Sequence, residues 1–170
     1  DMSMVTARCE QYESATTYFP FRPLTQRLVG VELNGDPAGN LQALAEQLET
    51  IDPELPPWAP LLAAPLDVEM ASTPEVDELE PAFRRARLHG VYGSLLSKVV
   101  DKPTFFLFED VHWMDEASSD LLRFLAGQLS PHPWLACATR RPGSGGFSAT
   151  EGTPPVPALN RTCSRKVGAN

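Results

Sequence analysis

The sequence predicts an α/β fold in which helices flank a parallel sheet. The apolar run at residues 105–108 leads directly into Glu109 and Asp110, and a buried parallel strand reads as such a continuous run. A helical pattern and a second apolar run at 135–138 follow after short turns. Strand, helix and strand in that order are typical of a βαβ unit. A chain of 170 residues with 42% apolar content is long enough for one domain with a core.

The segment before the first of these strands predicts one strand and two helices. Residues 3–9 are short and partly β-branched, which favours a strand. An aromatic and proline-rich segment, residues 18–24, leads into a helix that reaches about residue 29, with Pro23 in its first turn. Leucines at helical spacing predict a second helix over residues 38–50. Five prolines predict a loop over residues 52–65.

A long interrupted helix is expected before the strand at 105–108. Thr73 and Pro74 form a helix start, with a hydroxyl cap followed by proline at the first position. The apolar stripe then continues to about Val100. Pro81 removes a backbone hydrogen bond inside this stretch, so we expect a kink or a break there.

The segment after the strand at 105–108 predicts a capped helix, a strand and a tail. Asp115 is placed to cap a helix over residues 116–129. Cys137 lies in the following apolar run and is expected to be a small core residue. Residues 143–170 are rich in Gly, Ser, Thr and Pro and have no apolar period. We therefore expect a domain over residues 1–142 and a disordered or non-homologous tail over 143–170.

Composition excludes several classes of function. The net charge is −8, and twelve acidic residues but no Lys or Arg lie between Arg27 and Arg84. The acidic span predicts a solvated surface, and direct nucleic-acid binding by this segment is not expected. Three widely spaced cysteines give neither a disulfide framework nor a zinc pattern. No signal peptide or membrane-length apolar run is visible, so we expect a cytoplasmic protein with no membrane partner.

The adjacent acids Glu109 and Asp110 are the strongest indication of chemistry. Ligands in open α/β sheets bind beyond the carboxyl ends of the strands. A carboxylate pair at that place can hold Mg²⁺ and orient a hydrolytic water. This is the form of the Walker B element of a P-loop ATPase; the alternative is that the acids only cap the following turn. The phosphate-binding motif G-x-x-x-x-G-K-[ST] does not occur in the 170 residues.

Four sequence blocks resemble a known family. They are YFPFRPL at 18–24, TPEVDELEPAFRRARLHGVYGSLL at 73–96, FFLFEDVHWMDEASSDLL at 105–122 and PWLACATRRPG at 133–143. Together they resemble the STAND-type, AAA-like ATPase module of bacterial signalling proteins, in which it is joined to class III adenylate cyclase domains or LuxR-type DNA-binding domains. The resemblance covers about residues 5–142. It implies a partial P-loop NTPase-like sheet whose first strand and P-loop are absent, and ATP with Mg²⁺ as cofactors of the intact parent protein.

The resemblance also implies roles for single residues. Glu109 stands where the Mg²⁺-associated acid belongs, and Asp110 where the water-positioning acid belongs, which is also close to the metal. Arg140 stands where the family has a sensor residue facing the γ-phosphate; the alternative is a surface arginine in a turn. His112 is expected to be a structural hydrogen-bonding residue, and Asp115 a helix cap. No residue in these 170 is assigned to direct cofactor binding.

The function that follows is that of a fragment of an ATP-binding and ATP-hydrolysing regulatory module. The parent would be a bacterial adenylate cyclase-like or LuxR-type transcriptional regulator, with its output domain in the same chain and possible homo-oligomers. We expect the fragment alone to be inactive. The alternative is a non-catalytic interaction or scaffold fragment without nucleotide binding. A free adenylate cyclase is not supported, because none of that catalytic domain is visible.

Overall fold

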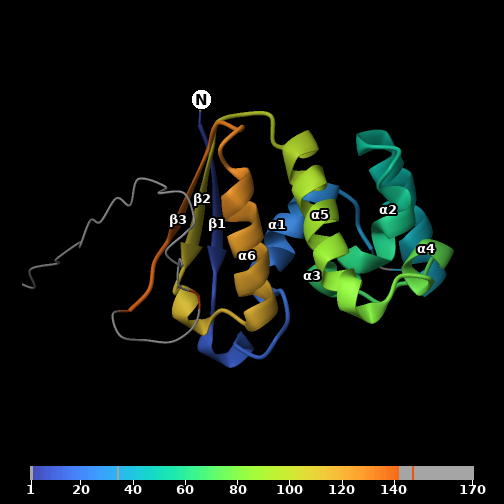
Figure 1. The fold of residues 1–170 in the computed structure, drawn as a ribbon, viewed down its shortest axis with the longest axis horizontal. Helices are drawn as coiled ribbons and strands as arrows, with labels where there is room; N and C mark the ends of the chain where they lie inside the picture. Colours follow the sequence, from blue (N-terminus) through green and yellow to red (C-terminus); the bar gives the residue numbers. More distant parts are fainter. Residues whose placement is uncertain (1, 34, 142–146, 148–170) are drawn as a thin grey trace, which may run out of the picture.

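A three-stranded parallel sheet with helices packed against one side forms the fold (Figure 1). The structure is a computed structural model that describes residues 2–33, 35–141 and 147. The strands are β1 (Ser3–Arg8), β2 (Thr104–Glu109) and β3 (Trp134–Ala138), in the order β1-β2-β3. Both pairings are parallel. The expected α/β architecture is therefore confirmed, and β2, which carries the acids, is the central strand.

The two faces of the sheet differ in burial because the described helices lie on one side of it (Figure 1). Phe106, Phe108 and Trp134 alternate onto the covered face and are buried. On the other face, Met4 is 56% exposed and Leu135 is 37% exposed.

The expectation that Cys137 is a small core residue is therefore wrong. Cys137 is only half-buried, and in β3 only Trp134 is buried, while Leu135 and Ala138 are exposed. The reason is that β3 is an edge strand covered by helices on one face only.

The first two predicted helices are confirmed between β1 and β2. Two short 3₁₀ turns, η1 (Gln11–Glu13) and η2 (Phe19–Phe21), lead into α1 (Arg22–Val29), with Pro23 in its first turn. Helix α2 (Pro37–Ile51) begins at the cap Asp36, whose carboxylate accepts a hydrogen bond from the Gly39 N–H at 2.8 Å. Helix α1 buries Leu24 and Leu28, and α2 buries Leu44 and Leu48 of the leucine spacing that predicted it.

The predicted loop over residues 52–65 is wrong. This segment forms the 3₁₀ helix η3 (Pro56–Leu62) and the start of α3 (Ala63–Leu66). Pro56 and Pro57 are tolerated because they stand in the first turn, where a backbone N–H has no helical partner, whereas Pro60 lies inside the 3₁₀ helix. Burial of Leu62 and Leu66 holds the turns against the helical layer.

The expected break at Pro81 is confirmed. The helix that starts at Pro74 ends early as α4 (Pro74–Asp77), and α5 (Pro81–Val99) begins at the second proline. Thr73 does not cap α4 through its side chain; its hydroxyl donates instead to the Pro57 carbonyl at 2.6 Å.

Aromatic packing fixes the central strand against the helices. Phe21 is fully buried, and its ring lies 5.4 Å from that of Phe108 and 5.7 Å, edge-on, from that of Tyr92. The Tyr92 hydroxyl lies 3.1 Å from the Thr25 hydroxyl, and burial raises the pKa of Tyr92. The YFPF block is thus a core element that joins α5 to β2.

The predicted βαβ unit is confirmed on the carboxyl side of β2. A short 3₁₀ turn, η4 (Val111–Trp113), connects β2 to α6 (Glu116–Gln128), and β3 follows. None of the helices in the described part of the chain combines the length and apolar character needed to cross a membrane. The predicted tail at 143–170 lies outside the described residues except for Phe147, so the domain boundary at residue 142 stays a prediction.

Candidate functional site

The carboxyl ends of the strands meet at one edge, and the predicted site residues are brought together there. Arg8 and Glu109 are register partners at the ends of β1 and β2. Beyond the last paired residues, the segments that follow β1 and β2 remain hydrogen-bonded, because the Cys9 N–H donates to the Glu109 carbonyl at 3.0 Å. The Thr139 N–H likewise donates to the Phe108 carbonyl at 2.9 Å. These bonds give the edge a fixed backbone on which side chains can be placed.

Glu109 is the last residue of β2 and is half-buried. Because side chains alternate along a strand, it lies on the face opposite to buried Phe108. Its register partner Arg8 shares that face.

Asp110 follows in a left-handed backbone conformation, with φ at 56°. Its N–H donates to the Thr139 hydroxyl at 3.2 Å, and its side chain is 40% exposed. Residues with a side chain seldom adopt positive φ, although Asp tolerates it better than most. Such conformations cluster at functional sites, where the surroundings hold them.

Asp115 is a helix cap, as predicted. Its Oδ1 accepts a hydrogen bond from the Ser118 N–H at 2.9 Å, and its Oδ2 accepts one from the Ser118 hydroxyl. Both carboxylate oxygens are therefore engaged at the start of α6, which leaves this residue a structural role.

Cys9 links the acids electrostatically and was not predicted as part of the site. It is buried at the end of β1, and burial raises the pKa of its thiol to about 12, with the charges of Asp115 and Asp110 adding to the rise. Negative charge from two segments of the chain thus converges near one buried thiol. The position of Cys9 directly after a predicted strand was the only sequence signal for this.

Arg140 lies two residues beyond the end of β3, on the same edge as the acids. Its Nη1 donates to the Phe147 carbonyl at 3.0 Å. The Phe147 N–H in turn donates to the Val111 carbonyl at 3.2 Å, and the Arg123 guanidinium lies 5.5 Å from the Phe147 ring centre. Phe147, which falls within the predicted tail, is only 8% exposed and joins Arg140 to the loop after β2.

The acids fit a magnesium–nucleotide site better than a metal site made by protein alone. Within the described residues, no three or more His, Cys, Asp or Glu side chains are grouped closely enough to hold a metal ion. Mg²⁺ at nucleotide sites commonly uses one or two carboxylates, completed by phosphate oxygens and waters. Glu109 and Asp110, adjacent and accessible at a strand end, match that donor set.

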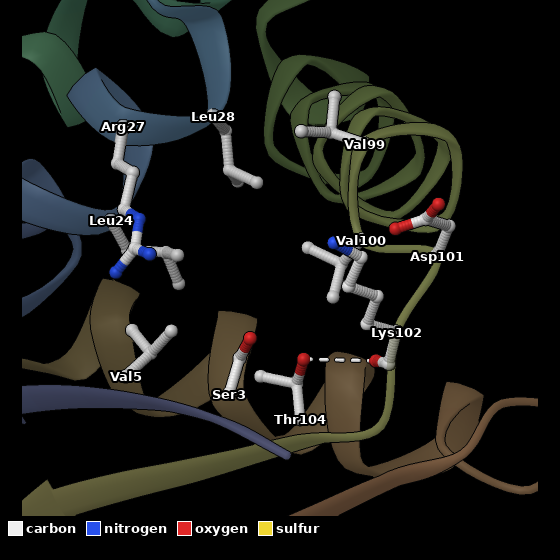
Figure 2. Close-up of a pocket in the computed structure, with 10 residues that line it drawn as sticks. All are labelled: Ser3, Val5, Leu24, Arg27, Leu28, Val99, Val100, Asp101, Lys102 and Thr104. Carbon is white, nitrogen blue, oxygen red and sulfur yellow. Dashed lines mark hydrogen bonds between the residues drawn. The ribbon is translucent and has the colours of Figure 1, made fainter. Parts of the chain in front are cut away.

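A separate cavity of about 190 Å³ lies at the opposite, amino end of the strands (Figure 2). Arg27 reaches into it from α1 and Lys102 from the turn before β2, above the hydroxyls of Ser3 and Thr104 (Figure 2). The Thr104 hydroxyl donates to the Lys102 carbonyl at 2.9 Å. Since the strands run between this cavity and the acids, it is not part of the candidate site.

Comparison with known families identifies the family to which this sheet and its flanking helices belong. A family model described as AAA ATPase domain matches residues 2–136, which is most of the chain. The chain belongs to the AAA ATPase domain family. Comparison with curated proteins and with solved structures gave no significant match. The matched residues of the AAA ATPase domain include Glu109 and Asp110 and end before Arg140.

Membership of this family supports an ATPase-type module that uses a nucleotide. The parallel sheet with flanking helices agrees with a partial P-loop NTPase-like fold. The edge at the carboxyl ends of the strands carries Glu109 and Asp110, with Arg140 two residues beyond the end of β3.

Proposed function

We propose that this AAA ATPase domain is the ATP-binding and ATP-hydrolysing switch of a bacterial signalling regulator. The observation that carries the proposal is the pair Glu109 and Asp110 at the carboxyl end of the central parallel strand. ATP binding and hydrolysis would bias the domain between two arrangements, and an output domain in the same protein would respond. By the resemblance of the sequence blocks to STAND-type modules, that output domain is adenylate cyclase-like or LuxR-type.

Each residue has a separate proposed task. When bound, Mg²⁺ would neutralise the developing charge on the phosphates. Glu109 would associate with the metal, while Asp110, close to it, would orient the attacking water. Arg140 would stabilise charge on the transferring phosphoryl group, because preorganised donors are most effective where charge develops. The hydrogen bond from Arg140 to Phe147 would have to open or turn for this contact.

Binding of the ATP phosphates must depend on residues other than Glu109, Asp110 and Arg140. A phosphate loop contributes backbone N–H donors and a lysine, and the printed sequence contains no such motif. We therefore expect these 170 residues alone to bind Mg²⁺–ATP very weakly and to hydrolyse none measurably. Micromolar affinity of the 170-residue chain by titration calorimetry, lost on changing both acids, would show that other residues of this chain assemble the site.

The test of the proposed roles is a paired measurement of ATP affinity and turnover on the longest reading frame that contains this chain. Asp110→Asn should remove most hydrolysis and keep ATP bound, because it removes a group that orients water. Glu109→Gln should also weaken Mg²⁺-dependent binding. Arg140→Ala should lower turnover roughly tenfold to a thousandfold, the usual effect of one lost charge-stabilising donor.

The outcome of these variants separates the assignments. Loss of binding in Asp110→Asn with loss of turnover alone in Glu109→Gln would exchange the roles of the two acids. If all three variants match the parent protein, the proposed Walker B element is wrong.

A non-catalytic interaction module is the second candidate function. It is favoured by the open sheet face, on which Met4 and Leu135 are exposed, and by the missing phosphate motif. The absence of ATP binding in every reading frame that contains the chain would select it. Homo-oligomers and a cytoplasmic location belong to the first proposal and would be checked by light scattering and by cell fractionation.

A further inference from the structure

His112 is a buried polar side chain whose ring nitrogens have no hydrogen-bond partner among the described residues. It lies in η4, directly after the candidate acids, and its side chain is 3% exposed. Neither Nδ1 nor Nε2 is within hydrogen-bonding reach of any polar atom in the part of the chain that the structure describes. Most buried polar atoms in proteins are paired, so an unpaired one calls for an explanation. Two on one ring, beside a candidate catalytic acid, point to a partner that is nearby but not yet engaged.

The nearest candidate partner is the carboxylate of Asp110. Its Oδ1 lies 3.9 Å from His112 Nδ1, about 1 Å beyond a hydrogen bond. Hydrogen bonds in ligand-free active sites are often long and tighten only when the substrate complex forms. The Asp110 side chain is 40% exposed and can rotate, whereas the buried imidazole cannot move far.

The backbone between the two side chains is held on both sides. The Val111 N–H donates to the Thr139 carbonyl at 2.9 Å, and the Val111 carbonyl accepts from the Phe147 N–H at 3.2 Å. The Trp113 ring packs against the imidazole, with ring centres 4.9 Å apart. With the main chain and the ring plane fixed, rotation of the Asp110 side chain is the movement that closes the gap.

We propose that His112 is a positioning residue that donates a hydrogen bond from Nδ1–H to the carboxylate of Asp110. One carboxylate oxygen would then be held by the imidazole. The other would face the space beyond the end of β2, where the water is to be oriented. This inference rests on the proposed function for its catalytic consequence, but the hydrogen bond itself does not depend on ATP.

The hydrogen bond is tested on the 170-residue chain by long-range ¹H–¹⁵N NMR of its histidines. His89 and His132 complete the set of three and serve as internal references. Above the pH range in which histidines ordinarily titrate, a neutral imidazole in water favours the proton on Nε2. We expect His112 to carry it on Nδ1 instead, and Asp110→Asn to shift the His112 signals and leave the other two unchanged.

Glu109→Gln is the matched control for this experiment, because it removes a neighbouring negative charge for which no ion pair with His112 is found among the described residues. It should leave the His112 signals in place. An Nε2–H tautomer that is insensitive to Asp110→Asn would overturn the proposal.

The catalytic consequence is tested by three substitutions in the longest reading frame. An asparagine amide nitrogen can reach the position of Nδ1, whereas a glutamine amide reaches that of Nε2. His112→Asn should therefore keep most of the turnover. His112→Gln and His112→Phe should lower kcat on the order of tenfold to a hundredfold, the usual effect of a misplaced catalytic group, with ATP affinity within about twofold of the parent.

Two results would contradict the positioning role. Parent-like kcat in His112→Phe would make the imidazole a packing residue, and rescue by glutamine alone would assign the contact to Nε2. If the reading frame hydrolyses no ATP at all, the proposed function fails, and the tautomer measurement still decides whether His112 is paired with Asp110.

Discussion

The two ends of the sheet are built from the same strands but differ in chemistry. At the amino end, the Ser3 N–H donates to the Pro103 carbonyl and the Thr104 N–H to that of Pro133, at 2.9 and 3.1 Å. Prolines have no N–H, so the ladder of hydrogen bonds simply stops. At the carboxyl end, the Val111 N–H donates to the Thr139 carbonyl and the Asp110 N–H to the Thr139 hydroxyl, which continues the network into the loops.

The side chains follow the same division. The cavity at the amino end is lined by the cations Arg27 and Lys102, by Asp101, by the hydroxyls of Ser3 and Thr104 and by apolar side chains. The carboxyl end carries Glu109 and Asp110, with Asp110 at positive φ and His112 buried without a partner among the described residues. Strain and unpaired polar groups are costs that folding alone would remove. Among the described residues, positive φ also occurs at Tyr18 and Asp67, and an unpaired ring nitrogen at Trp134, so the adjacent acids are what distinguish the carboxyl end.

The largest expected difference concerns the thiol at the carboxyl end. The pKa of Cys9 rises from 9.0 to about 12, and only the thiolate is nucleophilic. We expect native Cys9 to react with iodoacetamide on the order of a thousandfold more slowly than an ordinary exposed thiol. Half-buried Cys137 gives the comparison within the same chain, in a Cys163→Ser background and with site-resolved mass spectrometry. Equal labelling rates at Cys9 and Cys137 would contradict the burial of Cys9.

The raised pKa also has a consequence for stability. Between about pH 9 and 12 the folded chain keeps the Cys9 proton and the unfolded chain loses it. The unfolded state therefore binds fewer protons, and the free energy of unfolding falls as pH rises through this window. Cys9→Ala should make that fall shallower in urea unfolding measured at several pH values.

An intermediate effect is expected at the cap of α6. Asp115→Ala removes two hydrogen bonds to Ser118 and should lower the free energy of unfolding by about 1 kcal/mol, within a range of roughly 0.5–2. Asp36→Ala removes the equivalent cap of α2, far from the acids in the sequence. Urea denaturation of both variants should give similar losses. A much larger loss for Asp115→Ala would show that this residue does more than cap a helix.

A feature of the fold or of the candidate site could be predicted from the sequence when it depends on residues that are close together in the chain. The acids, the cap Asp115 and the break at Pro81 follow from neighbouring residues, and the structure confirms their placement. The helical turns of η3 do not follow from the local sequence, because its prolines favour a loop whereas the burial of Leu61 and Leu62 favours helical turns.

Contacts between distant segments left no local pattern. Phe147 packs beside Arg140 and Val111, and Thr139 binds the Asp110 backbone, only after the βαβ unit has formed. The half-exposed state of Cys137 likewise depends on which face the helices cover. A continuous apolar run predicts a strand of a parallel sheet, but it does not say how many of its faces are covered within the described chain.

The smallest effects are expected at the amino end. Arg27→Gln and Lys102→Gln remove exposed cations for which no ion pair is found among the described residues. Each should change the free energy of unfolding by less than about 0.5 kcal/mol, as most surface substitutions do. In the longest reading frame, neither should alter ATP turnover. A clear loss of turnover in either variant would show that the amino end of the sheet also takes part in ATP hydrolysis, which contradicts the proposed difference between the two ends of the sheet.

The central claim, that nucleotide lies at the carboxyl end of the sheet, is tested most directly by paramagnetic relaxation. Mn²⁺–ATP in place of Mg²⁺–ATP broadens NMR signals steeply with proximity, and β2 separates its two ends by roughly 17–20 Å. With the longest reading frame saturated with Mn²⁺–ATP, the amide signals of Glu109 and Asp110 should be lost, and those of Lys102 and Thr104 should remain. Loss of the Lys102 and Thr104 signals with those of Glu109 and Asp110 intact would place the nucleotide at the wrong end of the sheet and contradict the account.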